Sequence, residues 1–118
     1  MKEIDYFDRE LFLKGKLAIC MRTQFEVDSC IQKLPSLINN EIELSEYNLR
    51  SLEISMDIHN FAYVRVGFTR YGCNFTRFCT GNQIETAQLH GCDSYVNWSS
   101  IECSLLSPSL EEFLKDFW

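Results

Sequence analysis

Few side chains in this sequence are suited to proton transfer near neutral pH. His59 and His90 are its two histidines, and histidine is the side chain whose ordinary pKa lies closest to pH 7. Neither histidine belongs to a recognisable nucleophile or metalloprotease motif, and the sequence has no glycine-rich phosphate loop. Glu111 and Glu112 are adjacent on a predicted helix, where neighbouring side chains point apart. We therefore expect a protein that is not an enzyme.

Cysteines and one histidine raise the question of a metal site. The four side chains that could form a Cys3His zinc set are Cys73, Cys79, His90 and Cys92. Their spacing lacks the Cys-x2-4-Cys knuckle that lets two thiolates reach one tetrahedral ion. We expect no metal and no cofactor, and we interpret Cys20 and Cys30 as free thiols that fill the core.

Charge is distributed unevenly along the chain. Residues 41–57 hold five acids and one base, a net charge of −4, whereas residues 58–84 hold three arginines and no acid. An acidic stretch with an aromatic anchor suits a basic groove on a nucleic-acid-handling protein, where carboxylates occupy phosphate positions. The candidate partner-binding residues are Glu41, Glu43, Glu46, Tyr47, Glu53 and Asp57.

The arginine-containing stretch supports an alternative hypothesis. Guanidinium groups pair with phosphate bidentately, and an aromatic ring beside them stacks on a nucleobase. The alternative ligand-binding residues are Arg65, Arg70 and Arg77, with Tyr63 and Tyr71. With this set the protein would be a nucleotide-binding sponge.

Length and composition set the broad class. The chain has 118 residues, 11 Lys plus Arg and 17 Asp plus Glu, for a formal net charge of −6, so we expect a single domain over residues 1–118. This charge disfavours bulk attraction to DNA, RNA or an anionic membrane. No apolar stretch is long enough to span a bilayer, and the N-terminus lacks the apolar segment of a signal peptide. We therefore expect a cytoplasmic protein that binds neither nucleic acid nor membrane directly.

Apolar spacing predicts the elements of the first half. Residues 3–13 are expected to be helical, and residues 16–21 to form a central strand that is apolar on both faces. Thr23 and Glu26 form a capping box for an amphipathic helix over about 24–34, which Pro35 ends. Alternating residues over 52–58 and 61–70 predict an antiparallel hairpin with a three-residue loop, His59, Asn60 and Phe61.

The second half predicts a strand over 75–79, a short helix over 83–89 and a last strand over 94–98. Ser109 and Glu112 cap a C-terminal helix over about 109–117. Residues 36–50 show no clean period, apart from an Asn39–Asn40 turn, and are interpreted as an insertion. The predicted fold class is α+β, with a mixed or antiparallel sheet, one main packed helix and the C-terminal helix.

Two parts of the sequence resemble a known group of proteins. Residues 13–26 read LKGKLAICMRTQFE, and residues 63–67 (YVRVG) are followed by YVNWSSI at 95–101. These motifs resemble small strand–helix–hairpin accessory proteins encoded by bacteriophages and prophages, some of which inhibit host defence systems, including CRISPR effectors. The resemblance covers about half of the chain, and residues 36–50 and the C-terminal helix depart from it.

The resemblance implies a non-enzymatic, anti-CRISPR-like inhibitor in the cytoplasm of a bacterial host. Its partner would be a nucleic-acid-handling defence effector, which the acidic stretch would contact in competition with nucleic acid. The nucleotide-binding sponge stays open as the alternative. A third hypothesis is a homo-oligomeric phage accessory protein without an inhibitory target, joined through the edge of a hairpin.

Overall fold

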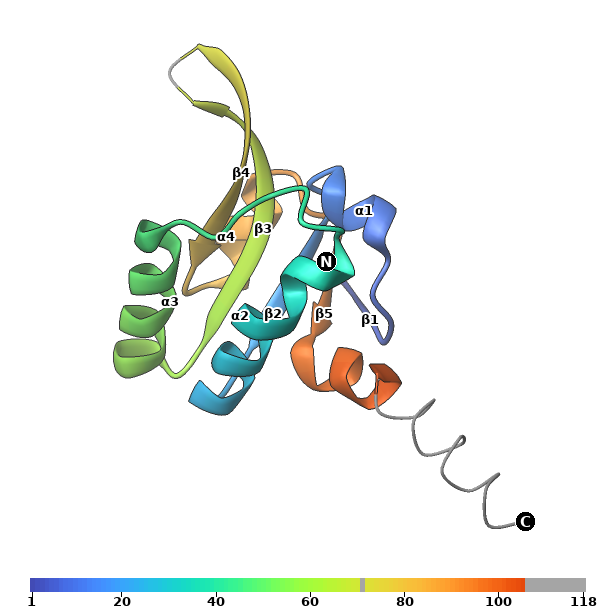
Figure 1. The fold of residues 1–118 in the computed structure, drawn as a ribbon, viewed down its shortest axis with the longest axis vertical. Coiled ribbons are helices and arrows are strands. Elements are labelled where there is room, and N and C mark those ends of the chain that lie inside the picture. The colour runs from blue at the N-terminus through green and yellow to red at the C-terminus, as the bar shows by residue number, and fades with distance from the viewer. Residues whose placement is uncertain (71, 106–118) are drawn as a thin grey trace, which may run out of the picture.

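A five-stranded sheet in the order β1-β5-β2-β3-β4 organises the protein (Figure 1). The structure is a computed structural model and describes residues 1–70 and 72–105. Its strands are β1 (Lys2–Ile4), β2 (Leu17–Met21), β3 (Ala62–Arg70), β4 (Cys73–Gly81) and β5 (Ser94–Asn97). Its helices are α1 (Arg9–Leu13), α2 (Gln24–Leu37), α3 (Glu46–His59) and α4 (Ile84–Leu89), and residues 98–105 are also helical.

Strand direction makes the sheet mixed. β1, β5 and β2 are parallel, whereas β3 is antiparallel to both β2 and β4. The predicted α+β class with a mixed sheet is therefore confirmed. β2 is buried along its whole length, as expected for a central strand that is apolar on both faces.

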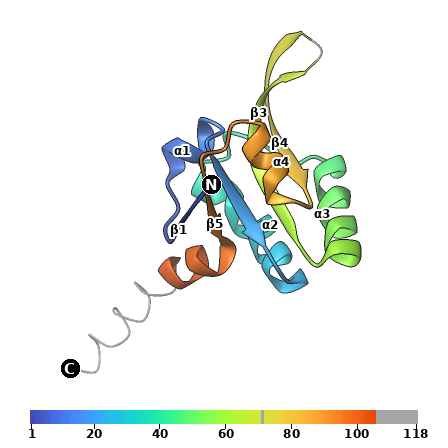
Figure 2. The same cartoon turned by 180° about the vertical axis from the view of Figure 1, so that it is seen from behind.

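Helices cover the two faces of the sheet unequally. α2 and α3 pack on one face, and the shorter α4 lies on the opposite face (Figures 1 and 2). The larger core includes Ile19 of β2, Leu34 of α2 and Leu52 of α3. The smaller core beneath α4 consists of Ala18, Cys20, Tyr63, Ala87 and Cys92. Since α4 has only six residues, it covers only part of the sheet face on which it packs.

The predicted N-terminus of α2 is confirmed. The Thr23 hydroxyl accepts a hydrogen bond from the backbone N–H of Glu26 at 3.1 Å. The Glu26 carboxylate reaches back to the N–H of Arg22 at 2.8 Å, one residue before the position that a standard capping box uses. The predicted end of this helix is wrong, because Pro35 lies inside it and the helix continues to Leu37.

The predicted hairpin over residues 52–70 is wrong. Residues 46–59 form α3, and β3 pairs instead with β2 and β4. Ser45 caps α3 in a reciprocal box with Asn48, and Asn60 ends it in the left-handed conformation at φ 52°. The Asn48 side-chain amide also donates to the Phe78 carbonyl of β4 at 3.0 Å. This bond ties the first turn of α3 to the sheet.

Both ends of the described chain depart from expectation. Residues 2–4 form a strand, so the helix predicted over 3–13 is limited to α1. The strand predicted over 94–98 ends at Asn97, and Trp98 opens helical residues 98–105. The predicted helix over 109–117 lies outside the described residues. The strand over 75–79 and the helix over 83–89 are confirmed within β4 and α4.

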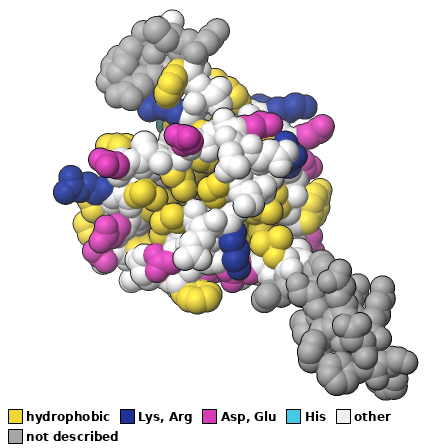
Figure 3. All heavy atoms as spheres, viewed as in Figure 1, with side chains coloured by type: hydrophobic (Ala, Val, Ile, Leu, Met, Phe, Trp, Pro, Cys, Tyr) yellow, Lys and Arg dark blue, Asp and Glu magenta, His cyan; other side chains and the backbone are white. Residues whose placement is uncertain are grey.

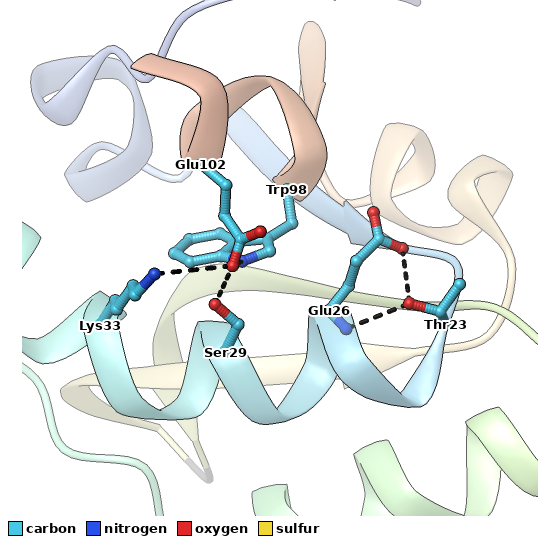
Figure 4. A network of polar contacts seen from close by, with 6 residues as sticks. All are labelled: Thr23, Glu26, Ser29, Lys33, Trp98 and Glu102. Atoms are coloured by element: carbon cyan, nitrogen blue, oxygen red, sulfur yellow. Dashed lines mark hydrogen bonds and ion pairs between the residues drawn. The ribbon is translucent and has the colours of Figure 1, made fainter. Parts of the chain in front are cut away.

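One carboxylate attaches helical residues 98–105 to α2 (Figure 4). Glu102 accepts hydrogen bonds from the Ser29 hydroxyl and from the Trp98 indole N–H, the latter at 3.0 Å, and lies 3.7 Å from the Lys33 ammonium. The Ser29 bond is the main cause of a Glu102 pKa below its usual value. The charged carboxylate therefore stabilises the packing of this helix.

Residues 36–50, the stretch interpreted as an insertion, hold the end of α2, the connection to α3 and the first residues of α3. Asn39 and Asn40 both have positive φ, 53° and 57°, which confirms the predicted turn. Ile38 and Ile42 around this turn are buried in the larger core. In the described part of the chain, no helix is long and apolar enough to cross a membrane.

Candidate anion-binding site

Two arginines share the α4 side of the sheet because of the β3–β4 register. Tyr63 pairs with Gly81, Arg65 with Cys79, and Gly67 with Arg77. Alternate residues of a strand point to the same face, so Arg65 and Arg77 are diagonal neighbours, roughly 7–8 Å apart in such a pair. The strand pairing thus brings two guanidinium groups together.

Both guanidinium groups carry a buried donor without a partner. The Nε atoms of Arg65 and Arg77 are buried and make no hydrogen bond to the described residues. Burial raises the pKa of Tyr63, and the neighbouring Arg65 guanidinium lowers it by a smaller amount. A buried donor left unsatisfied costs about 1–3 kcal/mol. Two such donors on neighbouring strands are unusual, and they mark Arg65 and Arg77 as candidates for a role beyond the fold.

The loop between α1 and β2 adds two lysines beside these arginines. Gly15 has φ 74°, and a Cβ at this position would lie 2.8 Å from both the Val66 carbonyl oxygen and the Phe68 ring. Only glycine satisfies both conditions without strain. The close approach sets Lys14 and Lys16, on either side of Gly15, against β3.

These groups surround one hollow of about 460 Å³. We call this hollow the basic pocket, and the lining side chains that define it are Lys14, Lys16, Arg65, Arg77, His90 and Phe68. His90 follows α4 and precedes Gly91, which turns the chain at φ 103°. Among the described residues that line the pocket, four are Lys or Arg and none is Asp or Glu.

Thiols beneath the pocket do not offset its charge. Burial raises the Cys20 pKa to about 12 and also raises the Cys92 pKa, so both groups are neutral at pH 7. Cys79 lies on the pocket wall, and its sulfur would be 2.7 Å from a Cβ at Gly67. The absence of a side chain at Gly67 therefore keeps room open beside the two arginines.

The arrangement is suited to a multiply charged anion. Guanidinium groups offer paired N–H donors that match phosphate and carboxylate oxygens, and lysine ammonium groups add compact charges. A volume of about 460 Å³ falls within the usual range for small-molecule sites, roughly 300–1,000 Å³. The pocket can hold a ligand larger than inorganic phosphate.

The structure brings together only part of the ligand set predicted from the sequence. Arg65 and Arg77 meet in the basic pocket. Tyr63 is 2% exposed, so its ring cannot stack on a ligand as expected; it packs against Gly81, where a Cβ would clash with it. Arg70 ends β3, but its side chain is not described, and Tyr71 lies outside the described residues.

Sequence reasoning missed four of the six side chains of the pocket as ligand-binding residues. Lys14, Lys16 and Phe68 were not candidates, although two lysines flank a glycine in the loop after the first helix, and His90 was considered only for proton transfer and zinc. Their role depends on strand order, since β2 and β3 must pair before this loop can approach Arg65.

The acidic candidates divide between a loop and α3. Glu41 is exposed and lies 3.3 Å from Arg9, and Glu43 is exposed in the loop before α3. The remaining candidates belong to one surface of the helix. We call this surface the α3 outer face, and it consists of Glu46, Tyr47, Glu53, Ile54, Asp57 and Ile58.

The α3 outer face combines acidic and apolar side chains in adjacent rows. Residues 46, 50, 53 and 57 lie along one helical row, so the exposed Arg50 stands between Glu46 and Glu53, and residues 47, 54 and 58 lie along the next. Tyr47 is 79% exposed and Ile58 is 67% exposed. Acidic and hydrophobic side chains lie side by side along the margin of the molecule where α3 runs (Figure 3).

A metal centre finds no support in the described residues. Within residues 1–70 and 72–105, no cluster of three or more His, Cys, Asp or Glu side chains is placed to hold an ion. Cys20 and Cys30 are buried free thiols, which confirms their predicted place in the core. A second hollow of about 310 Å³, beside Asp5 and Ser99, has one carboxylate and no basic group in its lining.

No protein-family model, curated protein or solved structure matches the chain.

Proposed function

We propose that this protein binds a small phosphate-bearing molecule in the basic pocket. The observation that carries the proposal is the pair of buried, unpartnered Nε atoms of Arg65 and Arg77. Lys14 and Lys16 supply further positive charge from a separate loop. Two arginines serving the fold alone would be expected to have carboxylate or carbonyl partners, because unpaired buried donors are costly.

Calorimetric titration tests this proposal. The titrants are inorganic phosphate, pyrophosphate and tripolyphosphate, with chloride at equal ionic strength as the reference. Affinity should rise with the charge of the anion and fall with added salt, because positive charges converge in the pocket. The variants Arg65→Met and Arg77→Met should each weaken binding at least tenfold.

The matched control is Arg50→Met, which removes an exposed arginine from α3, on the opposite face of the sheet. It should bind each anion as the wild type does. Equal loss of binding in Arg50→Met and Arg77→Met would show that only net charge matters and would overturn the proposed site.

The α3 outer face supports a second candidate function, docking on a host protein. Three acids flank Tyr47, Ile54 and Ile58 there, and exposed aromatic and aliphatic anchors beside charges are typical of protein interfaces. A basic, nucleic-acid-handling surface would complement it. In this form the protein is a phage-encoded, non-enzymatic, anti-CRISPR-like inhibitor, as the sequence resemblance implies.

Charge reversal tests the second candidate. In bacteria carrying a CRISPR effector, the protein should restore infection by a targeted phage, and Glu53→Lys with Asp57→Lys should abolish that effect. The control pair Asp28→Lys with Glu85→Lys changes net charge equally at exposed positions outside α3 and should retain it. Full protection of the phage by the Glu53/Asp57 variant would exclude docking through this face.

A further inference from the structure

Phe68 is an aromatic side chain in the basic pocket that anion binding alone does not explain. It is 44% exposed, follows Gly67 in β3, and lines the same hollow as Arg65 and Arg77. An exposed phenylalanine loses hydrophobic stabilisation that a buried position would provide. Its position beside four cationic groups therefore indicates a role other than filling the core.

Local structure fixes where this ring lies. The β3–β4 register shifts between Gly67 and Thr69, and such an irregularity redirects the side chain at that point. The Phe68 ring is close enough to Gly15 that a Cβ there would approach its Cε2 atom to 2.8 Å. The ring is thus positioned by the same glycine that sets Lys14 and Lys16 at the pocket.

We infer that the ligand of the basic pocket is a nucleoside phosphate whose base stacks on Phe68. This inference rests on the proposed function, since the arginines and lysines hold the phosphate. The aromatic ring supplies a flat apolar surface for the base, and such stacking tolerates any of the bases because every base has a π face. Tyr63 is buried, so among the aromatic candidates described here Phe68 takes the role that the sequence suggested for a tyrosine.

Pocket size and net charge favour a free nucleotide over a nucleic-acid strand. The hollow measures about 460 Å³, which suits a small molecule. Outside it the chain carries an excess of acid, with a net charge of −6 overall. A longer strand would bring further phosphates against that acidic surface, where each is repelled.

The experiment compares ligands that differ only by the base. The probes are the four common ribonucleoside monophosphates against ribose 5-phosphate, and the corresponding triphosphates against tripolyphosphate, all by calorimetry at one ionic strength. A nucleotide should bind about tenfold or more tightly than its base-free partner, as expected for one stacked base. Phe68→Ala should remove that advantage and change base-free phosphate binding by less than twofold.

Two further variants test whether the effect of Phe68→Ala comes from a folding defect or from the loss of any exposed phenylalanine. Phe68→Leu keeps an apolar side chain and should fold as the wild type does, yet lose most of the base advantage. Phe25→Ala removes an exposed phenylalanine from α2 and should bind every probe normally.

The outcomes separate this inference from the proposed function. If nucleotides and base-free phosphates bind equally and Phe68→Ala changes neither, the base inference is wrong while the anion site stands. If no phosphate compound binds, both fail. If a single-stranded oligonucleotide binds more tightly than any mononucleotide, the free-nucleotide assignment is overturned.

Discussion

Replacing Arg77 with methionine should stabilise the ligand-free protein while abolishing anion binding. Arg77 lies on β4 in the basic pocket, and its Nε is buried without a partner in the described structure. Methionine keeps much of the aliphatic volume of the arginine stem but removes both the unpaired donor and the positive charge. The substitution therefore isolates the cost of holding a cation ready for a ligand.

The size of the effect follows from three terms. An unsatisfied buried donor costs about 1–3 kcal/mol, and removing one of several like charges relieves repulsion in addition. Imperfect repacking of a new side chain costs less than about 1.5 kcal/mol. We expect a net gain of about 1 kcal/mol in the free energy of unfolding, or about 4 °C in melting temperature for a domain of this size.

Urea unfolding and thermal melting in phosphate-free, low-salt buffer measure this gain. Adding tripolyphosphate should then reverse the order of stability, because a ligand at 100 times its Kd stabilises the wild type by about 2.7 kcal/mol. The variant should not respond. Arg50→Met, which alters an exposed side chain, should change stability by less than about 0.5 kcal/mol.

The reasoning would be refuted by a variant that is less stable than the wild type in every buffer. Arg77 would then be a structural residue whose stem or guanidinium holds β4 in place. A variant that gains stability and still responds to tripolyphosphate would instead show that Arg77 is strained but does not contact the anion.

Three other predictions concern the elements that support the two faces. Glu102→Gln should lower stability at pH 7 by about 1–2 kcal/mol, less than the about 1.5–3 kcal/mol of hydrogen bonds to a charged group, because the glutamine amide oxygen still accepts. Since folding lowers the Glu102 pKa from 4.5, the difference from wild type should be full above pH 4.5 and disappear as the pH falls through the folded pKa. Thermal melts between pH 7 and pH 3 measure this difference. Asn48→Ala should cost about 2 kcal/mol in urea unfolding, since it removes both the capping box of α3 and the bond to a β4 carbonyl. Gly15→Ala should destabilise more than Gly72→Ala: both residues have positive φ, but only Gly15 has neighbours within 4 Å of a Cβ, so equal losses in thermal melts would show that crowding against β3 is unimportant.

The sequence predicted α2 well and α3 poorly, for a physical reason. Val27, Cys30 and Leu34 mark the buried side of α2 with apolar residues at helical spacing. On α3 the buried side includes two polar residues, Asn48 and Ser55, which do not count toward an apolar stripe. The carbonyl that accepts from the Asn48 amide belongs to β4, so this partner cannot be identified before the fold is known.

Exposed residues on α3 added to that error. Ile54 and Ile58 are largely exposed, yet with Leu52 and Met56 they complete an alternation typical of a strand. The feature that misled the secondary-structure prediction is thus part of the α3 outer face. A surface that keeps isoleucines in water departs from the usual pattern, and such departures are expected at interaction sites.

The basic pocket depended on pairings that the sequence did not reveal. The hairpin predicted for β3 paired it with residues 52–58, so the β3–β4 register that makes Arg65 and Arg77 diagonal neighbours was not predicted. Only the positive charge of the two arginines indicated a phosphate ligand. The turn at Gly15 could be predicted as the end of a helix, but its approach to Phe68 could not.

The basic pocket and the α3 outer face differ in charge, so the two proposed functions would select ligands of opposite charge. The α3 outer face carries three acids and the basic pocket four Lys or Arg side chains, so in a chain with a net charge of −6 the pocket is a local exception. An anion small enough to enter meets four cationic side chains, whereas a polyanion that extends past the pocket meets repulsion. Under the proposed functions, this acidic excess favours small ligands over nucleic-acid strands in the pocket, and the α3 outer face remains available to a basic partner. Because the two faces lie on opposite sides of the sheet (Figures 1 and 2), occupancy of one need not exclude occupancy of the other.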